Sequence, residues 1–134
     1  MPPVEPLEEP LSESKPRILC VDDEAIPLSL RKSVLERSGF EVIAINSGAA
    51  ALEVIEREPI DLVLTDMLMP GLSGTELARA IKQRRPELPI ILFSGVNEIP
   101  EDASFADLFL SKVEGPAKMC AKVSELLQHS QQRS

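Results

Sequence analysis

Apolar residues along the chain follow two alternating patterns. Short continuous apolar runs, which predict strands that are buried on both faces of a parallel sheet, occur five times. These runs are Ile18–Val21, Val42–Ile45, Leu62–Thr65, Ile90–Phe93 and Leu108–Leu110. Between them lie amphipathic stretches with apolar residues at helical spacing. The alternation predicts a doubly wound α/β domain, with helices on both faces of a five-stranded parallel sheet.

The amphipathic stretches also indicate where helices begin and end. We expect a first helix over about 25–38, a second that Ser47 caps and Pro59 ends, a third over 74–85, and a last helix from Gly115-Pro116. The apolar residues expected to face inward are Leu30, Val34 and Leu35, then Leu52 and Ile55, then Leu77 and Ile81, and finally Met119, Val123, Leu126 and Leu127.

Three segments have weaker patterns. The stretch between Ser94 and Leu108 should supply a further helix, which we expect to be short or irregular because Pro100 interrupts it. Residues 1–15 are rich in Pro and Glu and predict a disordered acidic tail. The folded domain should therefore span residues 16–128, followed by a polar C-terminal tail over 129–134.

Composition narrows the classes of protein to consider. The 134 residues are 43% hydrophobic, which fits a single domain with its own core. The net charge of −8 argues against direct binding of nucleic acid, which needs clustered basic residues. No apolar run approaches membrane-spanning length, and the N-terminus does not resemble a signal peptide. We therefore expect a cytoplasmic protein that does not bind membranes.

Cysteine and histidine do not predict a metal site or a disulfide. Cys20 and Cys120 lie far apart with no CxxC pair, and we expect both to be small buried side chains. The single histidine, His129, lies in the polar tail without a Cys or His neighbour, so we assign it no ligand or catalytic role.

Four of the five predicted strands end beside a charged or hydroxyl side chain. These side chains are Asp22, Asp23 and Glu24 after the first strand, Asp66 after the third, Ser94 after the fourth and Lys112 shortly after the fifth. Parallel strands end along one edge, where doubly wound sheets bind ligands. If the first and third strands are neighbours, each carboxylate pair at about 5 Å would repel by roughly 3 kcal/mol at an effective dielectric constant of about 20. A bound Mg²⁺ would remove this repulsion.

Each of these residues also has an ordinary structural explanation. An acidic run before a helix complements the helix dipole. Asp66 could be a turn residue, and Lys112 could be a surface lysine. These explanations do not account for the joint placement of all the residues along one edge.

The chain resembles the receiver domain of two-component response regulators over residues 16–128. ILCVDDEA resembles the acidic pair after the first strand of that family, and LVLTDMLMPGLSG its phosphoacceptor segment. IILFSG resembles its hydroxyl-bearing strand, and DLFLSK its aromatic residue and lysine. The resemblance implies the flavodoxin-like strand order 2-1-3-4-5.

The resemblance also implies roles for the acidic residues. Asp66 would be the phosphoacceptor, whose carboxylate attacks the phosphoryl group of a phosphohistidine. Asp23 and Asp66 would ligate Mg²⁺ directly, together with the backbone carbonyl of Leu68. Asp22 would act largely through water.

Three further residues would bind the phosphoryl group or respond to it. Lys112 would pair with a phosphoryl oxygen, and Ser94 would donate a hydroxyl hydrogen bond. Ser94 and Phe109 would then move inward and change the surface around the fifth strand. The domain would be a phosphorylation switch and not a multiple-turnover enzyme.

The sequence departs from the family pattern in the segment that leads to this surface. Val113 follows Lys112, where the family usually has proline. The interval from Ser94 to Lys112 is about four residues shorter than usual, near one helical turn. We therefore expect an atypical partner surface.

The implied partners are a sensor histidine kinase or a histidine phosphotransfer protein, and a downstream protein target. The resemblance also allows a homodimer. We expect a stand-alone regulator. The alternatives are a phosphorelay shuttle, a receiver that is part of a hybrid kinase, and a pseudo-receiver that binds partners without phosphorylation.

Two unrelated functions fit less well. A phosphatase of the haloacid dehalogenase class would need a second Asp two residues after Asp66, where this chain has Leu68. A flavodoxin-like nucleotide binder would need a Ser, Thr or Gly-rich loop after the first strand, where acidic residues would repel phosphate.

Overall fold

A parallel sheet runs through the middle of the computed structural model, which describes residues 15–95, 106–112 and 114–132. The strands are β1 (Arg17–Val21), β2 (Glu41–Ile45), β3 (Leu62–Asp66), β4 (Ile90–Ser94) and β5 (Leu108–Ser111). All neighbouring strands pair in parallel. Their order is β2-β1-β3-β4-β5, which confirms the predicted fold.

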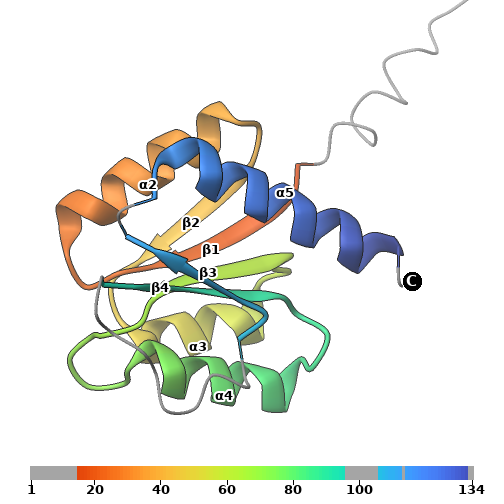
Figure 1. The fold of residues 1–134 in the computed structure, drawn as a ribbon. Coiled ribbons are helices and arrows are strands. Elements are labelled where there is room, and N and C mark those ends of the chain that lie inside the picture. The colour runs from red at the N-terminus through yellow and green to blue at the C-terminus, as the bar shows by residue number, and fades with distance from the viewer. Residues whose placement is uncertain (1–14, 96–105, 113, 133–134) are drawn as a thin grey trace, which may run out of the picture.

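Helices cover both faces of the sheet (Figure 1). They are α2 (Ala25–Arg37), α3 (Gly48–Arg57), α4 (Gly74–Arg84) and α5 (Pro116–Gln132). Helices α2 and α5 lie on one face, and α3 and α4 on the other. Helix α5 continues past residue 128, where we expected the folded domain to end.

The sheet separates two apolar cores, which explains why the strand sequences are continuously apolar. In β1, Ile18 and Cys20 belong to the core that includes residues of α2 and α5. Leu19 and Val21 belong to the core that includes residues of α3 and α4. Because side chains alternate along a strand, a strand buried on both faces needs apolar residues at every position.

Helix ends form as the local sequence predicts. The Ser47 hydroxyl accepts a hydrogen bond of 3.2 Å from the Ala50 amide and caps α3. Ser73 and Glu76 form a reciprocal capping box at the start of α4. Gly39 has φ of 100° just after α2, a conformation that favours glycine.

The predicted inward face of α2 was partly wrong. Leu30 is 63% exposed, whereas Leu28 and Leu35 are buried. Val34 is partly buried and packs against the core. Leu28, Arg31 and Leu35 have the spacing of one helix face, so the helix is rotated relative to the prediction.

The two cysteines differ in burial. Cys20 is fully buried, as predicted, and burial raises the pKa of its thiol to about 12. Cys120 is only partly buried, and its sulfur accepts a hydrogen bond of 3.1 Å from the Ser38 hydroxyl. The two thiols therefore have different environments.

Some predictions fall outside the described residues. These concern the tail over residues 1–14, most of the predicted fourth helix over 96–105, and Val113. Within the described segments, no helix combines the length and apolar character needed to cross a membrane.

Truncation of the two leucines tests the rotation of α2. We expect Leu28→Ala to lower the free energy of unfolding by about 2–4 kcal/mol, because it leaves a cavity in the core. Leu30→Ala should change it by less than about 0.5 kcal/mol, because that side chain is exposed. Urea unfolding followed by circular dichroism measures both, and equal effects would contradict the observed orientation.

Candidate functional site

Pairing of β1 with β3 brings two acidic turns together. Val21 lies opposite Thr65 in the parallel register, so Asp22 and Asp66 follow at neighbouring strand ends. The Asp22 amide donates a 3.2 Å hydrogen bond to the Ile45 carbonyl, which extends the pairing of β1 with β2. The backbone around both acids is therefore held by the sheet.

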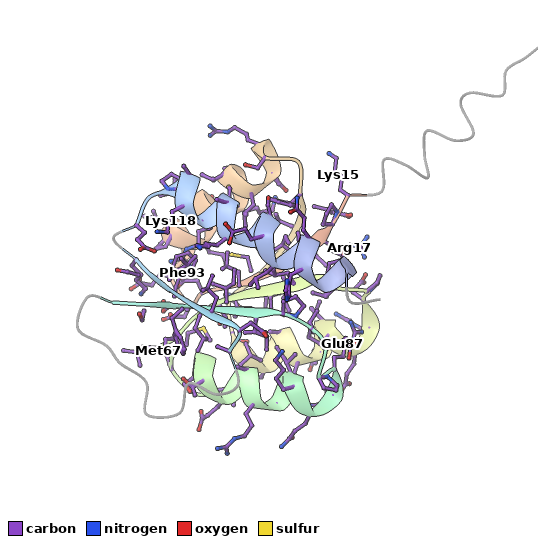
Figure 2. The ribbon with its side chains drawn as sticks, turned by 45° about the vertical axis from the view of Figure 1, so that its right-hand side comes forward. Lys15, Arg17, Met67, Glu87, Phe93 and Lys118 are labelled. Carbon is purple, nitrogen blue, oxygen red and sulfur yellow. The ribbon has the colours of Figure 1, made fainter. Side chains whose placement is uncertain are left out.

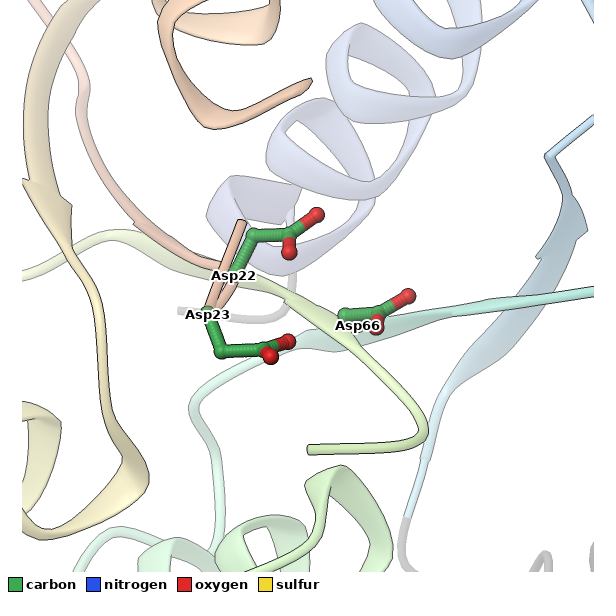
Figure 3. A group of neighbouring side chains, drawn as sticks. All are labelled: Asp22, Asp23 and Asp66. Atoms are coloured by element: carbon green, nitrogen blue, oxygen red, sulfur yellow. The ribbon is translucent and has the colours of Figure 1, made fainter. Parts of the chain in front are cut away.

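Three carboxyl groups meet at this edge. One oxygen from each of Asp22, Asp23 and Asp66 lies within 4.8 Å of the others. Figure 3 shows the three side chains at the ends of the two strands, with their carboxyl groups facing a common space. Asp22 and Asp66 are only 1% and 3% exposed, whereas Asp23 is exposed. Burial of two like charges is costly unless cations lie close to them or one acid takes up a proton.

Lys112 follows β5, the edge strand of the sheet, and its side chain extends to Asp66 at the end of β3. Its Nζ lies 2.7 Å from Asp66 Oδ1. Its amide donates a 2.9 Å hydrogen bond to the Ser94 carbonyl, which continues the pairing of β4 with β5. The predicted proximity of Lys112 to Asp66 is therefore present in the structure.

The three carboxyl groups offer oxygen ligands of the kind that a hard cation such as Mg²⁺ needs. Asp66 Oδ1 is a buried oxygen, and among the described residues its ion-pair contact at 2.7 Å with Lys112 Nζ leaves it without further hydrogen-bond donors. Buried oxygens normally have a partner. Carboxylate oxygens suit Mg²⁺, so the residues present fit this ion.

Backbone contacts fix the turn after β3. The Met67 amide donates a 2.8 Å hydrogen bond to the Phe93 carbonyl, and the Gly74 amide donates one of 2.8 Å to the Met67 carbonyl. A Cβ atom on Gly74 would overlap the carbonyl oxygen of Asp66. Gly74 therefore lets α4 begin directly against the strand end that carries Asp66 (Figure 2 shows Met67 and Phe93 at this end of the sheet).

Arg31 also belongs to the site, although the predicted inward face of α2 did not include it. Its Nη1 donates a 2.6 Å hydrogen bond to Asp22 Oδ2. The other Asp22 oxygen accepts a 2.9 Å bond from the Glu24 amide. The sequence could have identified Arg31 by its spacing, because it lies three residues after Leu28 and four before Leu35 and so shares their face of the helix.

The remaining predicted residues lie at or near the same edge. Ser94 ends β4 and is partly exposed. Phe109 is partly buried and lies opposite Leu92 in the register of β4 and β5. Leu68 lies in the turn after β3 and its side chain is 55% exposed. The structure places these residues, and their functional roles remain predictions.

The electrostatics of the site raise the pKa of both partners in the ion pair. Burial raises the pKa of Asp66, and the Asp22 carboxylate adds to this, against the opposing effect of Lys112. Burial lowers the pKa of Lys112, but the Asp66 and Asp22 carboxylates outweigh it and raise the pKa above its ordinary value. Lys112 is therefore a cation at neutral pH.

Replacement of Asp66 should stabilise the protein without metal. Because its pKa is raised in the folded state, the stability that Asp66 contributes is present below its unfolded pKa of about 3.9 and is lost as the pH rises through the folded value. We expect Asp66→Asn to raise Tm at pH 7 in EDTA by about 3 °C, near 1 kcal/mol for a domain of this size. The difference should disappear below about pH 3.5, and a lower Tm at pH 7 would contradict the raised pKa.

Substitution of Gly74 tests how closely α4 approaches Asp66. We expect Gly74→Ala to lower the free energy of unfolding by about 1–3 kcal/mol, because its Cβ would force the backbone apart. Gly115→Ala is the matched control, since a Cβ at Gly115 meets no atom within 4 Å among the described residues. Chemical denaturation of both variants measures the difference, and an equal loss would contradict this role of Gly74.

Comparisons with known proteins agree with this geometry. The family model for the response regulator receiver domain matches residues 18–124. Sensor histidine kinase GacS of Pseudomonas protegens is 45% identical over 89 residues, which are 63% of this chain and 10% of the kinase. The chain thus spans about a tenth of that relative.

Two other proteins match over most of their length. Two-component response regulator ORR5 of Oryza sativa subsp. japonica is 32% identical over 120 residues, which are 81% of this chain and 88% of that protein. The crystal structure of response regulator TrrA from Thermotoga maritima in complex with Mg²⁺-BeF has a TM-score of 0.78 and 34% identity, and covers 83% of this chain and 98% of that one. The chain therefore belongs to the response regulator receiver domain family of two-component signalling.

Proposed function

We propose that Asp66 accepts a phosphoryl group from a phosphohistidine and that this modification switches the surface of the domain. The observation that carries the proposal is the buried Asp66 carboxylate, which lies within 4.8 Å of the other two acids and has Lys112 Nζ at 2.7 Å. This arrangement presents a nucleophilic oxygen next to a fixed positive charge.

The proposed reaction is a direct displacement at phosphorus. A carboxylate oxygen of Asp66 forms the new O–P bond as the P–N bond to the histidine breaks, and the leaving nitrogen keeps the electron pair. The product is an acyl phosphate on Asp66 and a free imidazole on the donor. Lys112 keeps an anionic partner after the transfer, because its ammonium can contact a phosphoryl oxygen in place of the Asp66 carboxylate.

Metal binding forms part of the proposal. Asp23, Asp66 and the backbone carbonyl of Leu68 would hold Mg²⁺ directly, with Asp22 acting through water. When bound, the ion would supply positive charge that offsets the phosphoryl oxygens. The carboxylates would hold the ion next to the attacking oxygen at one edge of the sheet.

The proposed output is a change of surface around β5. Ser94 would donate its hydroxyl to the phosphoryl group, and Phe109 would follow it inward. Phe109 has no hydroxyl, so only packing can hold its inward position. Because Ser94 and Phe109 lie on paired strands, a shift at one strand end can reach the other.

The proposed donor is a sensor histidine kinase or a histidine phosphotransfer protein, and the readout is a downstream protein. We propose a stand-alone cytoplasmic regulator, which ORR5 supports because the chain spans 88% of that protein. The match to GacS favours the alternative, a receiver within a longer histidine kinase. In both cases the chemistry at Asp66 is the same.

Chemical phosphorylation tests the proposal. We expect acetyl phosphate with Mg²⁺ to add one phosphoryl group to the wild type and none to Asp66→Asn, because the variant lacks the nucleophilic oxygen. Intact-mass spectrometry measures the adduct. Asp61→Asn, which changes an exposed acid just before β3 at the opposite edge of the sheet, is the matched control and should be modified normally.

Beryllofluoride provides a second arm, because it mimics the acyl phosphate without a covalent donor. It should change the NMR spectrum of the wild type only when Mg²⁺ is present. A wild type that responds to neither reagent would refute phosphorylation at Asp66 and support a pseudo-receiver.

A further inference from the structure

Arg31 is a cation built into the acidic site from the inward face of α2. Its side chain is 14% exposed, and Nη1 lies 2.6 Å from Asp22 Oδ2. The guanidinium carbon lies 4.4 Å from the centroid of the Phe93 ring. An ion pair on one side and a cation–π contact with a buried ring on the other fix the guanidinium in place.

We propose that Arg31 competes with the divalent cation for Asp22 and so weakens Mg²⁺ binding by the unphosphorylated protein. This inference rests on the proposed function only in requiring that the acidic group binds a divalent cation. Arg31 is a positioning residue, because it acts through Asp22 and not on the reacting atoms.

The hydrogen bonds of Asp22 give the first reason. Its two oxygens are already engaged, one by Arg31 and the other by the Glu24 amide. A charge-assisted bond of 2.6 Å with a nearly buried partner is a strong one. For Asp22 to turn its charge toward a bound ion or toward water on that ion, this pair must weaken.

The charge balance gives the second reason. In the absence of metal, the three carboxylates with Lys112 and Arg31 carry one net negative charge. A divalent cation turns this into one net positive charge, and phosphorylation of Asp66 to a dianion then brings the total to zero. Arg31 therefore opposes the cation in the resting state and balances charge in the phosphorylated state.

A pocket beside Arg31 allows this side chain to be shortened in a test of the proposal. A cavity of about 260 Å³ lies between α2 and the start of α5, and Arg31 and Lys112 both line it. Water occupies about 30 Å³ per molecule in the liquid, so water can enter beside residue 31 when its side chain is shortened. Asp22 also keeps the Glu24 amide as a hydrogen-bond donor in such a variant.

The test measures Mg²⁺ affinity by isothermal titration calorimetry at fixed pH and ionic strength, because the chain has no Trp or Tyr for intrinsic fluorescence. We expect Arg31→Gln to lower the Kd for Mg²⁺ about tenfold, which corresponds to about 1.4 kcal/mol. Arg31→Lys keeps the charge but loses the planar group that stacks on Phe93, so its Kd should lie between those of the wild type and Arg31→Gln. Arg37→Gln, an exposed arginine in the last turn of the same helix, is the charge-matched control and should leave Kd unchanged.

A double variant separates competition for Asp22 from a general effect of charge. In an Asp22→Asn background, Arg31→Gln should tighten Mg²⁺ binding much less than in the wild-type background, because only the longer-range repulsion between Arg31 and the ion remains. Circular dichroism confirms that each variant is folded. A Kd for Arg31→Gln equal to or weaker than that of the wild type would overturn this inference alone, as would full tightening in the Asp22→Asn background. If neither the wild type nor Arg31→Gln binds Mg²⁺, the proposed metal site fails as well.

Discussion

The parallel hydrogen-bonded pairing of β1 with β3 is the constraint on which the site depends. It joins two turns that are more than forty residues apart in sequence and holds Asp22 and Asp66 at neighbouring strand ends. Because both strands are buried on both faces, their ends cannot move apart without disrupting the two cores. The repulsion between the carboxylates must therefore be relieved by cations or by protonation, and not by separation.

Two cationic side chains reduce this repulsion, and each comes from a different layer of the fold. Lys112 approaches Asp66 from the end of β5, and Arg31 approaches Asp22 from α2. Each forms an ion pair with one acid, Arg31 with Asp22 and Lys112 with Asp66, so within the described part of the chain neither forms an ion pair with Asp23. This division leaves the exposed side of the acidic group open, where a metal ion and a phosphoryl group would enter. The resting site is therefore held together by its own cations, while its negative charge remains only partly neutralised.

Local sequence predicted the strands and their ends because burial on both faces leaves a continuous apolar run that few other structures share. It also predicted that Asp22, Asp66 and Lys112 would meet, since strand ends in a parallel sheet converge. The rotation of α2 was not predictable in the same way, because two sets of residues in that helix have helical spacing. The set with Leu28 and Leu35 includes Arg31, and only a tertiary partner makes an inward arginine favourable. Phe109 shows a similar limit, since its place in an apolar run does not specify that the ring is only partly buried in the structure.

The unequal burial of the two thiols has a practical consequence. Cys20 lies inside the core with a pKa of about 12, so at neutral pH it is almost entirely the unreactive thiol. Cys120 is partly exposed on α5 beside the end of α2. A maleimide dye or spin label would therefore attach to one position in the native chain, with no cysteine removed or added. That position lies on the face of the sheet that carries Arg31, where a reporter group could follow rearrangement of α2 and α5.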